Sequence, residues 1–206
     1  MTARIAIIYY SATGNTARLA RAFEAGAVES GAEVRVRQVA ENAPDGAIDQ
    51  NRRWRAHVDS AERVEPPVLE DLEWADGIAI GSPTRFGGPA AQLKAFLDTT
   101  GGLWAKGVLA RKVGTSFTTA STTHGGLEST LLAMNNHFYH WGSIILPLGY
   151  AADQHLLHSG NPYGGSFVSH KSAAPDDTAL RACHLQGRRL GEVASIVSAG
   201  LAARST

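Results

Sequence analysis

Residues 11–16, which read SATGNT, lie between an apolar run and a helix-like segment and contain no Lys or Arg. Gly14 would let the backbone approach a ligand closely, and a helix N-terminus offers free amides that bind phosphate without a lysine. Four side chains could add neutral donors: Ser11, Thr13, Asn15 and Thr16. The segment therefore predicts a site for a single phosphate monoester, with ordinary helix capping by Ser, Thr and Asn as the alternative.

Sites for nucleoside triphosphates, dinucleotides and metal ions fit the sequence less well. It has no Walker pattern with its lysine, and GxGxxG occurs nowhere, so nucleoside triphosphates and the dinucleotide fingerprint are disfavoured. Two histidine pairs, His137/His140 and His155/His158, have a spacing that would suit a metal on a helix, but two histidines do not make a complete site. We expect no metal, and a structural role for Cys183 on the apolar face of the last helix.

Two more polar segments follow apolar runs: SPTRFGGP at 82–89 and TTASTTHGGLE at 118–128. The sequence alternates strand-like and helix-like segments, which predicts a doubly wound α/β fold with a parallel sheet and helices on both faces. In such sheets ligands bind beyond the carboxyl ends of the strands, so we expect the three polar exits to meet there. The predicted strands are 4–10, 32–39, 76–83, 112–119 and 143–150.

Helical patterns follow these strands at 17–26, 90–100 and 127–141, and the last helix is predicted to begin near Asp176, whose carboxylate could cap it. We expect one domain over 1–206 with two irregular surface excursions. The first covers about 40–67, with one short helix near 52–58, and the second covers about 151–175.

The composition bears on the partners and the cellular location that we expect for this protein. Lys plus Arg and Asp plus Glu number 19 each, which argues against a nucleic-acid partner. The chain has one cysteine and neither a secretory leader nor a run of about 18 apolar residues. A cytoplasmic protein without membrane insertion is expected.

The SxTGNT motif resembles the phosphate loop of flavodoxins, which bind FMN. Over nearly the whole chain, the sequence more specifically resembles the type IV NAD(P)H:quinone oxidoreductases, also called the tryptophan repressor-binding protein (WrbA) family. Five segments carry this second resemblance: GSPTRFGGPAAQLKAFLD, TGGLWAKGVLARKVGTSF, HGGLESTLL, PLGYAADQ and GNPYGGS.

The resemblance implies a flavodoxin-like five-stranded sheet in the order 2-1-3-4-5. It also implies FMN as cofactor, NADH or NADPH as donor and a quinone as acceptor. Two electrons would pass as hydride through flavin N5 by an alternating-substrate mechanism, so no catalytic protein residue is expected. A homotetramer with active sites between subunits is implied as well.

Carried over by position, the family's cofactor contacts fall in the three polar exits and on one helix: Ser11, Ala12, Thr13, Gly14, Asn15, Thr16, Pro83, Thr84, Arg85, Phe86, Gly87, Thr119, Ala120, Ser121, Thr122, Thr123, His124, Gly125 and His140. Trp104 and Thr13 correspond to substrate contacts. Thr13 stands where the family often has an aromatic residue, and the 119–125 loop is about one residue longer than usual.

The residue types agree with these assignments. Phe86 could give a flavin ring a flat apolar contact, and Arg85 could place positive charge near its pyrimidine end. Each of these residues also has a structural alternative. Phe86 could pack under its loop, Arg85 could be a solvated loop residue, His140 could be a packed residue that caps its helix, and Trp104 could lie in the core or at an interface.

Two other functions share parts of this pattern. A flavodoxin-type one-electron carrier would bind the same FMN but would dock on partners through an acidic surface, and this chain is balanced in charge. A regulatory binding protein is the other alternative, although the sequence has no basic stretch for DNA.

Overall fold

The computed structural model describes residues 2–150, 160–170 and 173–204. Its strands lie in one sheet with the order β2-β1-β3-β5-β6, and neighbouring strands along this path are parallel. This confirms the predicted doubly wound order. Their bounds are β1 Arg4–Tyr9, β2 Glu33–Gln38, β3 Gly77–Arg85, β5 Val113–Ala120 and β6 Ile144–Ile145.

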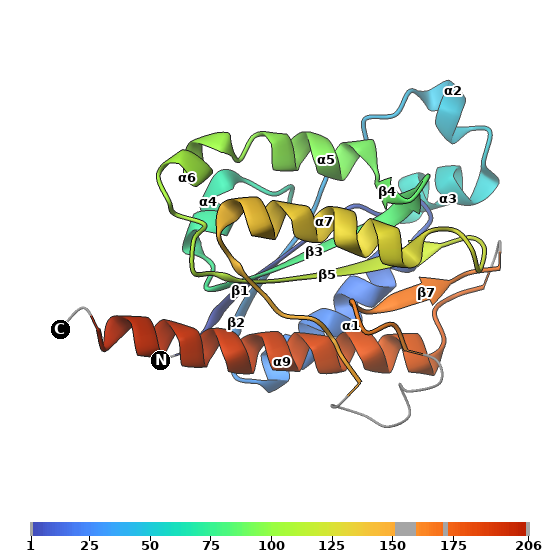
Figure 1. Cartoon of the computed structure of the whole chain (residues 1–206). Helices are drawn as coiled ribbons and strands as arrows, with labels where there is room; N and C mark the ends of the chain where they lie inside the picture. The colour runs from blue at the N-terminus through green and yellow to red at the C-terminus, as the bar shows by residue number, and fades with distance from the viewer. Residues whose placement is uncertain (1, 151–159, 171–172, 205–206) are drawn as a thin grey trace.

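Helices cover both faces of the sheet (Figure 1). One face carries α1 (Asn15–Glu29) and α9 (Asp177–Ala202). The other carries α4 (Leu69–Trp74), α5 (Ala91–Asp98), α6 (Gly101–Ala105) and α7 (Leu127–Trp141). The bounds of α7 match the prediction, and Asp176 caps α9 by accepting from the amide of Ala179 at 2.8 Å, also as predicted.

β1 shows why the apolar runs form central strands. Ile5 and Ile7 pack into the core under α1 and α9, while Ala6 and Ile8 pack into the core under the helices of the other face. Side chains alternate between the two faces of a strand, so a strand covered on both sides must be apolar at every position.

The predicted fifth strand is wrong in its extent. β6 ends at Ile145, and Pro147, which has no amide for a ladder, follows closely. The place beside the carboxyl half of β5 is taken by β7 (Ser166–Val168), which lies in the excursion predicted to be irregular. Gln186 on α9 holds this segment, because it accepts from Gly165 N at 2.7 Å and donates to Ser116 O at 3.0 Å.

The excursion at 40–67 contains two helices where the sequence predicted one. α3 (Arg52–Ser60) is the predicted helix, and its N-cap Asn51 accepts from the amides of Arg53 and Trp54. α2 (Asp45–Ile48) precedes it and was not predicted. No helix in the described ranges is both long and apolar enough to cross a bilayer.

Candidate cofactor site

The first polar exit wraps the start of α1. The Ser11 hydroxyl accepts from the amides of Gly14 and Ala17, both at 3.2 Å. Gly14 has φ +90°, a conformation that favours glycine. The side chain of Thr13 is half-buried and lies at the surface of the loop.

Two side chains of this loop bind other parts of the same edge of the sheet. Thr16, 1% exposed, shares a 3.1 Å hydrogen bond with Thr119 at the end of β5. Asn15 donates to Ala173 O at 3.1 Å. These contacts use both polar side chains to connect the loop to the second excursion and to the third exit, so the loop's position is fixed before any ligand binds.

The second exit is a short hairpin rather than a loop. β3 continues to Arg85 and pairs antiparallel with β4 (Gly88–Pro89). Phe86, at the tip, has φ +52° and is fully exposed. Its side chain therefore packs against no other part of the described chain, and its predicted contact with a flavin stays a prediction.

The hairpin and the third exit are joined closely. Thr84 donates to Gly125 O at 3.0 Å and accepts from Thr130 at 2.8 Å. Gly126 has φ +87°, and a Cβ added there would lie 2.9 Å from the Cα of Gly87. A side chain at Gly126 would therefore push the two exits apart.

The three exits line one hollow of about 320 Å³, called here the rim pocket. It is within the size range of small-ligand sites, at the lower end. Its lining residues are Ala12, Thr13, Asn15, Ala47, Gln50, Asn51, Trp54, Pro83, Thr84, Arg85, Thr119, Ala120, Ser121 and Ser169. Among these described lining residues, Arg85 carries a charged side chain and none carries a carboxylate. The lining therefore suits a neutral or anionic ligand.

The outer wall of the rim pocket was missed by the sequence reasoning. It consists of Ala47, Gln50, Asn51 and Trp54 on and between α2 and α3. The one available signal was a tryptophan in an otherwise polar excursion. Ser169, which follows β7, was missed because it lies in the excursion that was predicted to be irregular.

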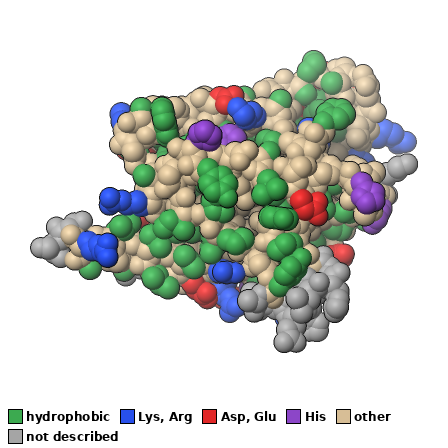
Figure 2. Space-filling view, viewed as in Figure 1, with side chains coloured by type: hydrophobic (Ala, Val, Ile, Leu, Met, Phe, Trp, Pro, Cys, Tyr) green, Lys and Arg blue, Asp and Glu red, His purple; other side chains and the backbone are tan. Residues whose placement is uncertain are grey.

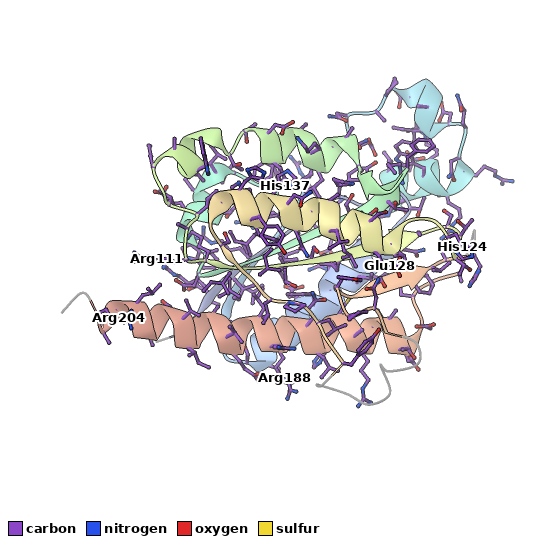
Figure 3. All side chains as sticks on the ribbon, in the orientation of Figure 1. Arg111, His124, Glu128, His137, Arg188 and Arg204 are labelled. Carbon is purple, nitrogen blue, oxygen red and sulfur yellow. The ribbon has the colours of Figure 1, made fainter. Side chains whose placement is uncertain are left out.

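Other predicted contacts lie outside the rim pocket in this chain. Gly87, Thr122, Thr123, His124 and Gly125 are on the surrounding loops, and Figure 3 shows His124 at the outer end of the loop after β5.

His140 and Trp104 lie farther away. His140 is in the last turn of α7, 13 residues after Leu127, or about 20 Å along the helix. Trp104 is on α6, near the opposite end of the sheet (Figure 1). Neither residue lines the rim pocket of its own chain.

A second hollow, of about 440 Å³, lies between α1 and α3 and includes Gly14, Arg18 and His57. A Cβ on Gly14 would lie 3.4 Å from His57 Nδ1, so α3 lies directly over residues 11–16. Burial and the nearby Arg18 lower the pKa of His57, with Glu41 opposing them. His57 Nε2 is buried without a hydrogen-bond partner in the described structure.

Metal ligation finds no support at these hollows. Among the described residues, no group of three or more His, Cys, Asp or Glu side chains is placed to hold a metal ion. The pair His155/His158 lies outside the described residues. Cys183 is fully buried in the core under α1 and α9, and burial raises the pKa of its thiol.

Comparison with known proteins identifies the family. Residues 3–156 match the family model described as NADPH-dependent FMN reductase. The chain belongs to this family. A protein of Deinococcus radiodurans named NAD(P)H dehydrogenase (quinone) is 42% identical over 81% of this chain and 83% of its own length. One of the same name from Methylocella silvestris is 38% identical over 93% and 97%.

Solved structures show the same fold. A flavodoxin of Agrobacterium tumefaciens described as a WrbA-like protein superposes with a TM-score of 0.68 at 22% identity, over 94% of this chain and 98% of that one. An archaeal flavodoxin superposes with a TM-score of 0.62 at 18% identity, over 93% and 99%. The flavodoxin-like fold predicted from the sequence is thereby confirmed.

The residues of the site fit FMN, which combines one phosphate with a planar ring. The glycine conformation at Gly14 and the surrounding neutral donors suit the phosphate. The rim pocket, lined by neutral groups and by the Arg85 cation, suits an aromatic ring with polar edges.

Proposed function

We propose that this FMN reductase family member is an FMN-dependent NAD(P)H:quinone oxidoreductase. NAD(P)H, a proton and a quinone would give NAD(P)⁺ and the hydroquinone, a two-electron reduction. The observation that carries the proposal is the meeting of all three polar exits in one pocket of neutral donors and one arginine. The printed names of the relatives support the same reaction.

The protein's part in this reaction is binding and orientation. Bound FMN supplies the two-electron transfer between donor and acceptor. Residues 11–16 would hold its phosphate, with the hydroxyls of Ser11 and Thr13 and the first amides of α1 as donors. Pro83–Arg85 and Thr119–Ser121 would support the ring, and Arg85 would place positive charge at the edge where a reduced flavin gains negative charge.

A homotetramer with shared active sites is part of the proposal. Trp104, Tyr139 and Leu132 are large apolar residues that are 56%, 69% and 44% exposed on α6 and α7. Figure 2 shows several hydrophobic side chains at the surface of the face that carries α7. Assembly through this side would cover them and could bring Trp104 and His140 of a second copy to the rim pocket.

The activity is tested with FMN-reconstituted protein by following NADH and NADPH oxidation with benzoquinone as acceptor. Parallel double-reciprocal lines are expected. Bound FMN without turnover would contradict the enzyme and favour the one-electron carrier.

The phosphate site is tested by Ser11→Ala combined with Thr13→Ala. Hydrogen bonds to a charged group are worth about 1.5–3 kcal/mol, so the Kd for FMN should rise about tenfold or more. The Kd for riboflavin, which lacks the phosphate, should not change. Thr99→Ala is the matched control, because this hydroxyl donates to Phe96 O at the far end of α5. An unchanged FMN affinity in the double variant would remove the proposed phosphate role.

A further inference from the structure

α3 is placed over the rim pocket without the packing that usually positions a helix. A surface helix ordinarily buries an apolar stripe, but none of the residues of α3 is buried. Its large apolar side chain is Trp54, which is half-buried, contacts the core and also lines the rim pocket. Packing against the core therefore explains only in part why the Trp54 side chain is oriented as it is.

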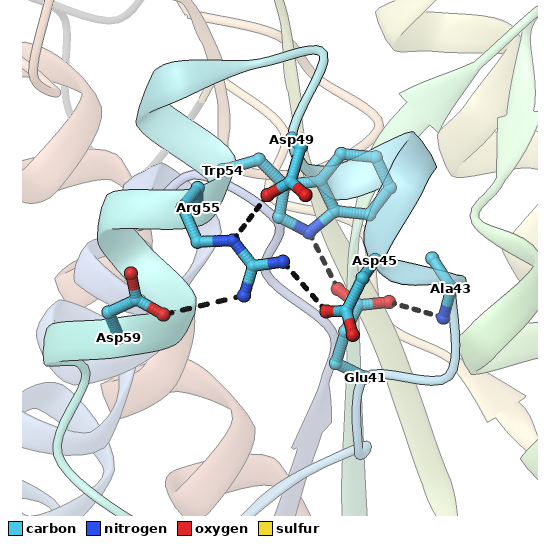
Figure 4. A network of polar contacts seen from close by, with 7 residues as sticks. All are labelled: Glu41, Ala43, Asp45, Asp49, Trp54, Arg55 and Asp59. Atoms are coloured by element: carbon cyan, nitrogen blue, oxygen red, sulfur yellow. Dashed lines mark hydrogen bonds and ion pairs between the residues drawn. The ribbon is translucent and has the colours of Figure 1, made fainter.

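The orientation of Trp54 is set by a carboxylate. The indole Nε1 of Trp54 donates to Glu41 Oε2 at 2.7 Å. The same carboxylate accepts from the Tyr10 hydroxyl at 2.6 Å, from Gln92 at 2.8 Å and from the amide of Ala43 at 3.0 Å. These donors come from the residue after β1, from α5 and from the loop before α2, so Glu41 connects the indole to three parts of the fold. Figure 4 shows the contacts of Glu41 with Trp54 and Ala43.

Glu41 keeps its charge in this position. Burial alone would raise its pKa, but the hydrogen bonds from Tyr10, Ala43, Trp54 and Gln92 outweigh burial, and the pKa lies below its usual value. The ionised carboxylate can therefore accept all of these bonds at neutral pH.

The residue after Trp54 connects α3 to α2. The Arg55 guanidinium contacts Asp45 and Asp49, each at 2.7 Å, and Asp59 at 3.4 Å (Figure 4). Asp45 and Asp49 lie at the two ends of α2, so the Arg55 side chain links the two helices of the outer wall. The wall thus has two polar connections, one to the core through Glu41 and one within itself through Arg55.

We propose that Trp54 is the aromatic wall of the rim pocket and stacks on the flavin ring from the side opposite the three polar exits, with Glu41 as its positioning residue. The inference rests on the proposed function, because it takes FMN as the ligand. A pocket of about 320 Å³ between this indole and the strand ends admits one planar ring system. An indole is electron-rich and an oxidised flavin is electron-poor, which favours a stacked contact.

The experiment compares FMN and riboflavin binding by Trp54→Ala, Trp54→Phe and the wild type, with bound-flavin fluorescence as a second signal. Aromatic stacking is worth about 0.5–1.5 kcal/mol beyond area burial, so Trp54→Ala should raise both Kd values by the same factor, about three- to tenfold. Bound flavin should become more fluorescent. Trp54→Phe should retain most of the affinity. Trp74→Phe is the matched control, since Trp74 lies beneath the Arg35 guanidinium beside β2.

The pattern across ligands separates this inference from the proposed function. The Ser11→Ala, Thr13→Ala variant should affect FMN alone, whereas Trp54→Ala should affect FMN and riboflavin equally. Equal wild-type and Trp54→Ala affinities for both flavins, with unchanged circular dichroism, would overturn the role of Trp54 and leave the proposed function standing. Unchanged flavin affinity with a raised KM for the quinone would also overturn it, and would place the indole against the substrate. Failure of the wild type to bind either flavin would remove both proposals.

Glu41 is tested by a conservative and a non-conservative change. Glu41→Ala removes the acceptor and should weaken riboflavin binding as much as Trp54→Ala does. Glu41→Gln keeps an acceptor oxygen of the same shape and should restore part of the affinity and of the fluorescence quenching. A purely structural Glu41 would lower the melting temperature in both variants without changing the fluorescence of bound flavin, and that outcome would overturn the positioning role.

Discussion

The two walls of the rim pocket are built by different means. The inner wall consists of strand ends and their loops, joined by hydrogen bonds between neutral groups, such as Thr16 with Thr119 and Thr84 with Gly125. The outer wall is α2 and α3, which the ionised side chains of Glu41 and Arg55 link to the rest of the fold and to each other. The comparison indicates that the fold itself specifies the inner wall, whereas a few side chains specify the outer wall.

This difference has an energetic consequence. Hydrogen bonds between buried neutral groups respond little to salt or pH, while exposed ion pairs are screened by salt. Changes to the inner wall should therefore affect the stability of the whole fold. Changes to the outer wall should affect local opening and ligand binding, and they should depend on the solution conditions.

The largest expected effect is that of Gly126→Ala in the inner wall. Gly126 has φ +87°, and the new Cβ would meet Gly87 at 2.9 Å. The left-handed conformation alone costs about 1–2 kcal/mol for a residue with a Cβ, and the contact adds to it. We expect a loss of about 2 kcal/mol or more in the free energy of unfolding, measured by urea denaturation, together with weaker flavin binding.

Gly46→Ala is the matched control for the outer wall. Gly46 lies in α2, its φ is not positive, and an added Cβ meets nothing within 4 Å. Alanine favours a helix over glycine, so stability should be unchanged or slightly higher. If the two variants lost similar amounts of stability, the proposed contrast between the walls would be wrong.

The contrast also explains what the sequence could predict. The inner wall follows from local patterns: the apolar run of β1, the turn and capping residues of SATGNT, and the rule that parallel strand ends share one edge. β7 could not be predicted, because three residues are too few for a periodic signal. β7 pairs with β5, which lies more than 40 residues earlier in the chain. The segment that leads into β7 is held by Gln186, which accepts a hydrogen bond from the amide of Gly165.

The outer wall could not be predicted for a related reason. Glu41 contacts Gln92, 51 residues later in the chain, and no local pattern reports such a pair. Trp54 in the sequence reads as one aromatic residue in a polar segment. Its orientation depends on the hydrogen bond to Glu41, a carboxylate that also accepts from Tyr10 after β1 and from Gln92 on α5.

An intermediate effect is expected when the pH is lowered, because protonation of His57 on α3 should weaken the docking of this helix. Its pKa is lowered by burial and by Arg18, so the docked helix favours the neutral imidazole. A group whose folded pKa is lowered in this way binds its proton more readily in the undocked state. Docking of α3 should therefore be strongest above pH 6.5, the ordinary value for histidine, and should weaken as the pH falls below it.

Hydrogen exchange of the α3 amides between pH 7.5 and 5.5, corrected for the intrinsic pH dependence of exchange, measures this opening. His57→Gln should remove the pH dependence in this range. Glu41 does not contribute here, because its lowered pKa places its own loss of charge at more acidic pH. An equal pH dependence in wild type and His57→Gln would exclude the histidine as the cause.

The smallest effect is expected from Arg55→Gln, even though Arg55 makes three ion pairs. Its carboxylate partners are exposed, with Asp45 at 83% and Asp49 at 59%, and pairs of this kind contribute little because water and salt screen them. The melting temperature should hardly change, while flavin affinity should fall slightly at low salt and match the wild type at high salt. If Arg55→Gln weakened flavin binding as much as Trp54→Ala at every salt concentration, the link between α2 and α3 would determine the outer wall more than Glu41 does. The indole would then depend for its position on the whole α2–α3 unit rather than on a single carboxylate.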